Sequence, residues 1–411
     1  MPARLPTAGW QDDAVPTDPL PQHCPTPREL DDLELLVSGA LAPLTGFNEP
    51  GSPVTLSLPP EVAGQDVELV DPEGLPLARV TGDGSVASLT HAQFGPFRRL
   101  YLTPGEVRER HAGSVFVPVS GPLTRGQVAT LPTDPPVVLL VLVGAGTPEG
   151  LSPVGLIRAT LAAAEALPQA SVVAVPLASH GDPTADHLLG HQVVGNYAAG
   201  DEVRGVTDDD EGDLSDEVAA VVDFDRPPAD ERGLVLFFTG LSGSGKSTLA
   251  RALQDRILEG GRRTVTSLDG DVVRRNLSAG LSFSREDRET NIRRIGWVAA
   301  EVSRHGGVAI CSPIAPFDET RQQVRAMVED AGGEFFLIHV ATPLEECERR
   351  DRKGLYAKAR AGEIPEFTGI SSPYEEPDDA AVRVDTTGRS IEDALADVER
   401  ALAAAGLLDL G

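Results

Sequence analysis

The sequence predicts an α/β protein whose C-terminal part is a parallel sheet flanked by helices. One observation is that an apolar run and three further runs typical of short buried strands alternate there with helical patterns, as in parallel sheets. These runs are residues 234–238, 264–268, 308–312 and 334–340. A second observation is that the first run is followed by a glycine-rich loop at residues 240–247 and by a helical pattern from Thr248. Strand, loop and helix in this order match the phosphate-binding pattern G-x-x-x-x-G-K-[ST].

The composition limits the class of protein and its partners. The chain has 411 residues, 41% of them hydrophobic, which allows two or three domains with cores of their own. No run of eighteen apolar residues occurs and residues 1–27 lack a signal-peptide pattern, so we expect a soluble cytoplasmic protein with no membrane partner. The formal net charge of −28 argues against a nucleic-acid partner, because surplus Lys and Arg hold phosphate backbones. Three widely spaced cysteines, Cys24, Cys311 and Cys347, predict reduced thiols, two of them buried.

The N-terminal half shows two different patterns. Short alternating runs separated by Gly and Pro predict a small β-rich module; they are residues 54–58, 67–70, 77–80 and 114–119. A strand–helix–strand pattern follows at residues 137–143, 154–167 and 171–177. The acidic run from Thr207 to Glu217 is typical of a solvated linker. We therefore predict an extended leader (1–30), a β-rich domain (31–134), an α/β segment (135–203), an acidic linker (204–231) and a C-terminal α/β domain (232–411).

The start of the β-rich domain resembles ATP sulfurylases. The resemblance rests on Leu33-Glu34-Leu35-Leu36, Ser38-Gly39-Ala40 and Pro43-Leu44-Thr45-Gly46-Phe47. It implies a PUA-like β-fold for residues 31–134 and a truncated, degenerate sulfurylase-like α/β segment for residues 135–203. That family grips ATP phosphates with a Q-x-R-N-P-x-H-x-x-H signature, whereas this chain has Gly144-Ala145-Gly146-Thr147-Pro148-Glu149-Gly150 at the matching place. The resemblance therefore implies a region without sulfurylase chemistry.

Two histidines in the α/β segment have the spacing of helical metal ligands. His187 and His191 stand four residues apart. The residue after His187 is Leu188, not the Glu of H-E-x-x-H, and no other His or Cys is close in sequence. A surface or structural role is therefore the favoured interpretation.

The loop after the first C-terminal strand contains the groups that hold a nucleotide triphosphate. Its backbone N–H groups and the following helix N-terminus attract phosphate oxygens. We expect ATP to be bound by Gly240, Leu241, Ser242, Gly243, Ser244, Gly245, Lys246, Ser247 and Thr248. Lys246 is expected to reach the transferred phosphate and Ser247 to ligate Mg²⁺. An accidental Gly/Ser-rich turn is the alternative, but the flanking strand and helix favour a P-loop NTPase sheet.

Polar clusters follow the later strands, where ligands of parallel sheets bind. Asp269-Gly270-Asp271 comes directly after the run 264–268, and Arg274 follows it. Two carboxylates here could hold the Mg²⁺ shell and accept a proton, and Arg274 offers donors to an anion. A purely structural Asp-Gly turn with a capping aspartate is the alternative. The position one strand after a phosphate loop favours the functional interpretation.

Two further clusters point to an anionic substrate. Arg288 and Asn291 are three residues apart and share a helix face, and Phe283 could stack on a purine. A solvated charged helix is the alternative for this cluster. The basic stretch 352–362 in an acidic protein suits a lid that closes over phosphates.

Together these clusters resemble adenylyl-sulfate (APS) kinases over residues 232–405. The family's blocks recur in order: the phosphate loop, Leu268-Asp269-Gly270-Asp271, Asp287-Arg288 with Asn291-Ile292-Arg293-Arg294, Ile314-Ala315-Pro316, Lys353-Gly354-Leu355-Tyr356, and Phe367-Thr368-Gly369-Ile370. The resemblance implies that ATP and Mg²⁺ bind at the loop, with Ser247 and Asp269 as metal residues and Lys246, Asp269 and Asp271 as catalytic residues. It implies that APS is bound by Asp271, Arg274, Phe283, Arg288, Asn291, Ile314, Lys353, Leu355 and Phe367. Asp269 is our choice for the group that takes the proton of the 3′-hydroxyl.

The chain departs from the family at a few positions. Val272 stands where many members have Asn, and Ser282 stands where many have Gly, but neither position supplies an essential charge. Ala315 replaces a Ser that has been proposed to carry a phosphoryl group in some members. A covalent route through that position is excluded, so we expect direct in-line transfer from ATP to APS.

The predicted activity is therefore APS kinase, in sulfate assimilation. One alternative is a bifunctional enzyme that also makes APS from ATP and sulfate. Another is that residues 31–203 form a nucleotide-sensing module or dock a separate sulfurylase. The resemblance also implies a homodimer.

Overall fold

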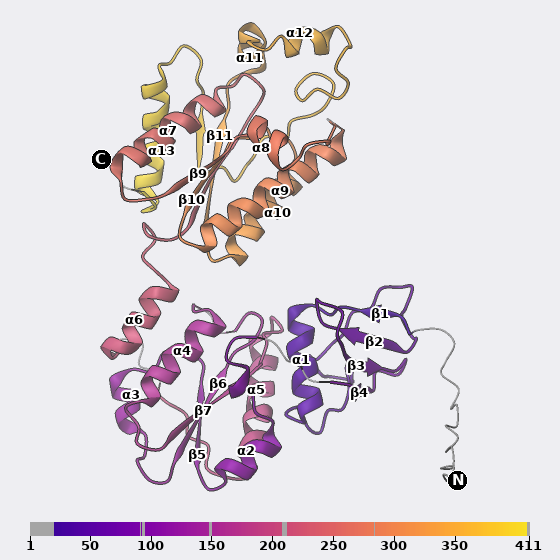
Figure 1. Ribbon diagram of the computed structural model, residues 1–411, viewed down its shortest axis with the longest axis vertical. Coiled ribbons are helices and arrows are strands. Elements are labelled where there is room, and N and C mark those ends of the chain that lie inside the picture. Colours follow the sequence, from indigo (N-terminus) through magenta and orange to yellow (C-terminus); the bar gives the residue numbers. More distant parts are fainter. Residues whose placement is uncertain are drawn as a thin grey trace, which may run out of the picture. The chain divides into compact units, whose positions relative to one another are not determined.

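Two units, Met1–Arg226 and Pro227–Gly411, make up the chain (Figure 1). The structure is a computed structural model that describes residues 20–90, 92, 95–147, 150–207, 212–282 and 284–408. Residues 1–19, which form most of the predicted leader, lie outside this described part.

The C-terminal unit is built on a five-stranded sheet with the order β12-β11-β8-β10-β9. Its strands are β8 (Leu234–Thr239), β9 (Val265–Leu268), β10 (Val308–Cys311), β11 (Glu334–Val340) and β12 (Val382–Val384). All neighbouring strands are parallel. The predicted parallel sheet is confirmed, and β8, which leads into the phosphate-binding loop, lies at its centre.

Helices cover both faces of this sheet, because successive side chains of a buried strand point to opposite faces. Phe238 packs with Leu253 of α7 and Val398 of α13 in one core, and Phe237 packs with Ile295 of α9 in the other. Figure 1 shows α9 and α10 together on one side of the sheet and α7 and α13 on the other. The helices are α7 (Lys246–Gly260), α8 (Gly270–Asn276), α9 (Arg285–Arg304), α10 (Asp318–Asp330), α11 (Leu344–Arg350), α12 (Leu355–Arg360) and α13 (Ile391–Ala404).

The N-terminal unit contains a three-stranded parallel sheet of order β5-β6-β7. Its strands are β5 (Val115–Val119), β6 (Val137–Leu142) and β7 (Ala170–Val175). Leu156 of α4 and Val218 of α6 pack on one face, and Leu189 and Val193 of α5 belong to the core on the other. The surrounding helices are α2 (Pro104–His111), α3 (Arg125–Thr130), α4 (Pro153–Ala164), α5 (Pro183–Ala198) and α6 (Asp216–Asp225), with a 3₁₀ turn, η1 (Arg98–Leu100).

A four-stranded sheet of order β1-β2-β3-β4 completes this unit. Its elements are β1 (Gln22–His23), α1 (Pro27–Ser38), β2 (Val67–Val70), β3 (Pro76–Val80) and β4 (Val86–Ser88). One core joins it to the three-stranded sheet, since Leu35 of α1 and Leu69 of β2 cluster with Val138 of β6. The PUA-like assignment of this part stays a prediction.

Two predictions about the N-terminal strands are wrong. The run 54–58 forms no strand, because side chains satisfy its backbone: Asn48 Oδ1 accepts from the Leu56 N–H at 3.2 Å and Glu29 Oε1 accepts from the Ser57 N–H at 2.8 Å. The run 114–119 was assigned to the β-rich domain, but β5 pairs with β6 and so belongs to the parallel sheet. The boundary predicted at residue 134 therefore falls inside a sheet.

The predicted leader and linker both contain ordered elements. Helix α1 begins at Pro27, before the predicted end of the leader, because Thr26 and Glu29 form a capping box. Helix α6 lies within the predicted linker and is capped by Ser215. The Ser152 N–H donates to Asp225 Oδ2 at 2.7 Å, which fixes the end of α6 against the start of α4. Residues 208–211 of the acidic run lie outside the described part.

Candidate active site

The phosphate-binding loop depends on its glycines. Gly240, Gly243 and Gly245 have φ angles of 145°, 77° and 107°, which side chains other than glycine rarely adopt. A Cβ atom at Gly240 would lie 2.4 Å from the Val340 carbonyl oxygen. No side chain caps α7, which follows directly, so its first N–H groups stay available to an anion.

Lys246 lies inside this loop. The residue is 7% exposed, and its Nζ donates to the Leu241 carbonyl oxygen at 2.7 Å. Burial lowers the pKa of Lys246 to about 8, although the charge of Asp269 acts in the opposite direction. A bound phosphate would supply the negative charge that favours the ammonium form.

Asp269 connects the ends of three strands. It directly follows β9, and its Oδ2 accepts from Ser247 Oγ at 2.9 Å and from Ser312 Oγ at 3.1 Å. Ser247 belongs to the loop after β8, and Ser312 directly follows β10. The structure thus brings together two of the predicted residues, Ser247 and Asp269, and adds Ser312, which the sequence prediction missed. A polar residue at the end of a central strand was the available signal.

We expect Ser312→Ala to lower kcat by about tenfold, because a hydrogen bond to a charged group contributes on the order of 1.5 kcal/mol to holding Asp269 in place. KM for the predicted substrate APS should change less than twofold. Steady-state kinetics of Ser312→Ala and of Ser278→Ala test this, because Ser278 is a buried serine whose Oγ has no hydrogen-bond partner in the described part of the chain. Equal loss in both variants, or recovery of less activity in Ser312→Thr than in Ser312→Ala, would contradict a positioning role.

Arg288 is the centre of a second group of predicted residues. Its guanidinium donates to Thr368 Oγ1 at 3.0 Å and to Ser372 Oγ at 3.3 Å, and its side chain is 12% exposed. Its Nε is buried and has no partner in the described part of the chain. Asn291, three residues on, is buried as well, and its Oδ1 is likewise without a described partner. Unsatisfied donors and acceptors on one helix face are what a polar substrate would complete.

The predicted lid contacts the phosphate-binding loop through a residue that the sequence prediction did not select. Tyr356 of α12 donates from its hydroxyl to the Ser242 carbonyl oxygen at 2.8 Å. The Phe367 ring packs edge-on against the Tyr356 ring, with centroids 5.1 Å apart. The predicted substrate residue Phe367 is therefore connected to the phosphate-binding loop through Tyr356.

Ile314 is held in place by Thr239, the residue that precedes the phosphate-binding loop. Thr239 Oγ1 donates to the Ile314 carbonyl oxygen at 2.6 Å. The next residue, Ala315, has a φ of 45°, and its carbonyl oxygen accepts from Arg321 Nη1 at 2.9 Å. Arg321 is 1% exposed, so a fully buried guanidinium holds the strained backbone of Ala315, next to the predicted substrate contact Ile314.

The structure describes the remaining predicted site residues only in part. Arg274 donates from Nη1 to the Ser282 carbonyl oxygen at 3.1 Å, while Phe283 itself lies outside the described residues. Asp271 lies on α8, but its side chain is outside the described part. Lys353 and Leu355 lie at the start of the lid, exposed and half-buried respectively.

Metal and membrane features were searched over the described residues. They contain no group of three or more His, Cys, Asp or Glu side chains placed to hold a metal ion. The rings of His187 and His191 pack edge-on at 4.6 Å, which agrees with a structural role. None of the described helices combines the length and apolar character needed to cross a membrane. Cys311 and Cys347 are buried and Cys24 is exposed, and all three are free thiols, as predicted.

In the N-terminal unit, the place that matches the ATP-phosphate signature of sulfurylases is occupied by acidic side chains of the chain itself. Asp31 Oδ2 accepts from the Ala145 N–H at 2.7 Å, in the loop after β6. His180, in the loop after β7, contacts Asp32 through Nε2 at 3.1 Å and Asp186 through Nδ1 at 2.9 Å. The carboxylates thus take donors that a nucleotide phosphate would need, and they repel an anion.

This cluster makes a pH-dependent contribution to stability. The hydrogen bond to Asp32, helped by Asp186, raises the pKa of His180 above its usual 6.5. The stabilisation is therefore fully present below about pH 6.5 and is lost as pH rises through the folded-state pKa. Chemical denaturation of the full chain should show that His180→Asn costs about 3 kcal/mol at pH 6 and less at pH 8.5. A pH-independent cost, or an equal one in the exposed control His187→Asn, would contradict this assignment.

Comparison with known families identifies the C-terminal unit. Residues 232–385 match the family model described as adenylylsulphate kinase. The sulfate adenylyltransferases of Neosartorya fischeri and Phaeosphaeria nodorum are 47% and 48% identical over 193 and 192 residues, which is 47% of this chain in both cases. Those segments are 34% and 33% of the relatives, so the chain spans about a third of the length of the curated relatives that it matches.

Two solved structures extend the comparison. The hexameric APS kinase from Thiobacillus denitrificans is 27% identical, with a TM-score of 0.70, and the similarity covers 95% of this chain and 94% of that one. A match of this extent includes both units. The APS kinase CysC of Mycobacterium tuberculosis, in complex with AMPPNP and APS, is 45% identical over 43% of this chain and 99% of that one, with a TM-score of 0.41.

Proposed function

The chain belongs, through residues 232–385, to the adenylylsulphate kinase family, and from this membership and the site geometry we propose that it transfers the γ-phosphoryl group of ATP to the 3′-hydroxyl of APS. The products are 3′-phosphoadenylyl sulfate and ADP. The observation that carries the proposal is the meeting of Lys246, Ser247 and Asp269 at the ends of β8 and β9. This arrangement provides positioning and charge neutralisation, on which phosphoryl transfer depends.

Each residue has a separate role in the proposed reaction. Lys246 pairs with the phosphate that moves, and the loop N–H groups hold the others. Asp269 orients the 3′-hydroxyl and accepts its proton as the oxygen attacks phosphorus in line with the departing ADP. The bond to ADP breaks as the new bond forms, and Ala315 offers no hydroxyl for a covalent intermediate.

The residues fit Mg²⁺, which prefers oxygen ligands and keeps several waters. Ser247 Oγ and Asp269 Oδ2 lie 2.9 Å apart, so a hydroxyl and a carboxylate are available to the ion and its water shell. When bound, Mg²⁺ would neutralise charge on the phosphates of ATP.

APS is proposed to bind between α9 and the lid. Arg288 and Arg274 supply the cations for its phosphosulfate, Asn291 supplies a polar side chain, and Phe367 supplies a ring face for its adenine. The unsatisfied Arg288 Nε and Asn291 Oδ1 support this placement. Ile314, Lys353 and Leu355 are further APS contacts in the proposal, and Asp271 and Phe283 are included from the family resemblance alone.

The N-terminal unit is proposed to be without sulfurylase activity. Support comes from the acidic cluster of Asp31, Asp32 and Asp186, which stands where an ATP-phosphate grip is expected. The Thiobacillus denitrificans APS kinase shares the architecture of both units, which also favours kinase activity alone. The names of the fungal relatives favour a bifunctional enzyme, but the matched part is only about a third of their length.

The deciding experiment uses purified full-length protein with ATP and Mg²⁺, and either APS or sulfate. We expect 3′-phosphoadenylyl sulfate from APS and no pyrophosphate release with sulfate. Activity with both would establish the bifunctional alternative, and activity with neither would refute the kinase proposal. Hydrogen exchange of the full-length chain with and without ATP or APS tests the sensing alternative, since a ligand of the N-terminal unit would protect backbone amides of that unit.

The oligomeric state and compartment are also proposals. The predicted homodimer, like a partner sulfurylase, comes from the family resemblance, whereas the Thiobacillus denitrificans protein is hexameric. Light scattering of the full-length chain distinguishes dimer from hexamer. The proposed compartment is the cytoplasm.

A further inference from the structure

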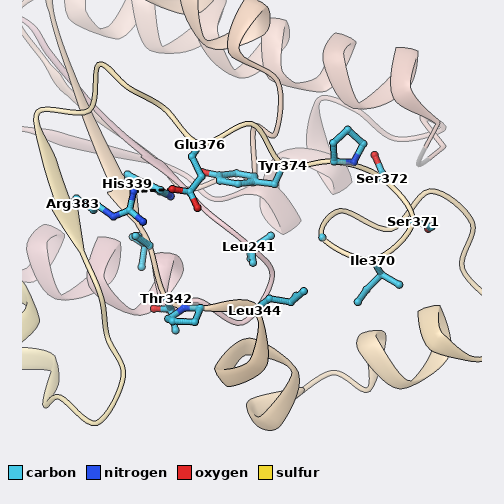
Figure 2. A pocket seen from close by; sticks show the side chains of 15 residues that line it. Leu241, His339, Thr342, Leu344, Ile370, Ser371, Ser372, Tyr374, Glu376 and Arg383 are labelled. Atoms are coloured by element: carbon cyan, nitrogen blue, oxygen red, sulfur yellow. Dashed lines mark hydrogen bonds and ion pairs between the residues drawn. The ribbon is translucent and has the colours of Figure 1, made fainter.

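The C-terminal unit contains a pocket that the proposed reaction does not use. It has a volume of about 700 Å³ and lies beside the ends of β11 and β12, under the segment 369–376 (Figure 2). Neither Lys246, Asp269 nor Arg288 lines it. The volume is within the range of small-molecule sites, roughly 300–1,000 Å³.

The pocket has apolar walls and an aromatic side. Leu241, Leu344 and Ile370 converge on it from the phosphate-binding loop, from α11 and from the segment 369–376 (Figure 2). Tyr374 and His339 form the aromatic side, with ring centroids 5.7 Å apart and planes inclined by 30°. A flat ring could lie between these two sides, because aromatic faces stack and aliphatic side chains cover the other face.

One edge of the pocket presents a hydrogen-bond donor and an acceptor side by side. Arg383 Nη1 donates to Glu376 Oε2 at 2.8 Å, and the two side chains are 59% and 60% exposed. Such an exposed pair is weak, so a ligand can share its donor and acceptor. An edge of this kind matches a nucleobase, which also carries adjacent donors and acceptors.

His339 adds an unsatisfied group to the same edge. The residue is 2% exposed, and its Nδ1 is buried without a partner in the described part of the chain. Burial and the charge of Arg383 lower the pKa of His339 to about 4, so the ring is neutral at pH 7. A neutral imidazole offers one donor and one acceptor. A small rotation of the ring toward a bound ligand would satisfy a nitrogen that is now unpaired.

We propose that this pocket is a second binding site, for a purine base or nucleoside. The base would lie between Ile370 and the Tyr374 ring, with its polar edge toward Glu376 and Arg383. Among the lining residues Arg383 is the sole Arg or Lys, so the pocket lacks the cluster of cations that would bind phosphates.

Residues that line the pocket also contact residues next to the proposed reaction site. Tyr374 hydroxyl and Thr239 Oγ1 lie 3.0 Å apart, and Thr239 precedes the phosphate-binding loop. Leu241 belongs to the loop itself, and Ser372 accepts from Arg288. A ligand here would therefore touch the supports of both the ATP loop and the Arg288 group, without occupying either.

Equilibrium dialysis of radiolabelled adenosine against the full-length chain tests the proposal. AMPPNP, Mg²⁺ and APS are kept saturating, so that the sites of the proposed reaction are filled. We expect one adenosine per chain, with a Kd below 1 mM, and binding of uridine at least tenfold weaker. No adenosine binding, or equal binding of uridine, would overturn the proposal.

Variants locate the site. Glu376→Gln combined with Arg383→Gln should weaken adenosine binding at least tenfold. Ile370→Trp should block binding, because the larger side chain would fill the space proposed for the base beside the Tyr374 ring. The control Arg400→Gln removes another exposed ion-pair arginine, which lies outside the pocket, and should have no effect. Unchanged binding in both pocket variants would place the adenosine elsewhere and refute the assignment. Kinase turnover is measured separately in the double variant, so failure of the proposed reaction and failure of this site remain distinguishable.

Discussion

Replacing Lys246 with Ala should lower kcat by about 10³-fold or more, because a preorganised cation at a transferring phosphate contributes on the order of 4 kcal/mol to transition-state stabilisation. Lys246 is buried and its Nζ lies inside the loop, so bulk water or a neighbouring side chain cannot replace it. The measurement is kcat for 3′-phosphoadenylyl sulfate formation with saturating ATP and APS.

The Lys246→Ala substitution is not expected to destabilise the folded state. Burying a charged ammonium costs free energy, as the lowered pKa of Lys246 shows, so its removal relieves that cost. Tm should therefore stay unchanged or rise. Arg251→Ala is the matched control, since Arg251 is an exposed cation on the same helix, α7, and should leave kcat within twofold. A Lys246→Ala variant that retains more than a tenth of wild-type turnover would refute the assigned role.

Asp269→Asn should lower kcat by about 10³-fold, because general-base catalysis contributes about 10²- to 10⁴-fold. Asn keeps the size of the side chain and an acceptor for Ser247 and Ser312, but it cannot take up the proton of the 3′-hydroxyl. KM for APS should change less than threefold, since APS binding is assigned to Arg288 and its neighbours.

The same variant separates proton transfer from metal binding. If Asp269 served only Mg²⁺ and its waters, raising the Mg²⁺ concentration would restore most of kcat. We expect kcat to stay low at saturating Mg²⁺. Asp255→Asn, an exposed carboxylate on α7, is the control and should be active. A defect confined to KM, or full recovery with Mg²⁺, would contradict the role of Asp269 as base.

Local sequence patterns were sufficient to predict the fold class and the phosphate-binding loop of the C-terminal unit. The loop at residues 240–247 is contiguous, so its glycine spacing and Lys246 could be read directly. Strands β8, β10 and β11 are largely apolar runs because both faces of the sheet are buried there, whereas β9 is partly exposed although its run was predicted to be buried. The parallel sheet, the loop and the position of Asp269 at a strand end were therefore predictable.

Contacts between distant segments were not predictable from spacing alone. Ser312 lies 43 residues from Asp269, and Tyr356 lies 114 residues from Ser242, so only the fold brings each pair together. Arg321 looked like one of many helix arginines, yet it is fully buried under Ala315. The pocket beside β11 and β12 combines segments that share no motif.

The N-terminal unit shows the same division between local and distant effects. The helix of residues 154–167 and its two flanking strands were predicted from periodicity and were confirmed. The partner of β5 was not, because an alternating run does not reveal which strand it pairs with. The sequence by itself determined the fold class, the phosphate-binding loop and the family resemblance, since these depend on residues close together in the chain. Tertiary structure alone decided the strand pairing, the support of Asp269 and the acidic cluster around His180, since these depend on side chains that meet only when distant segments pack.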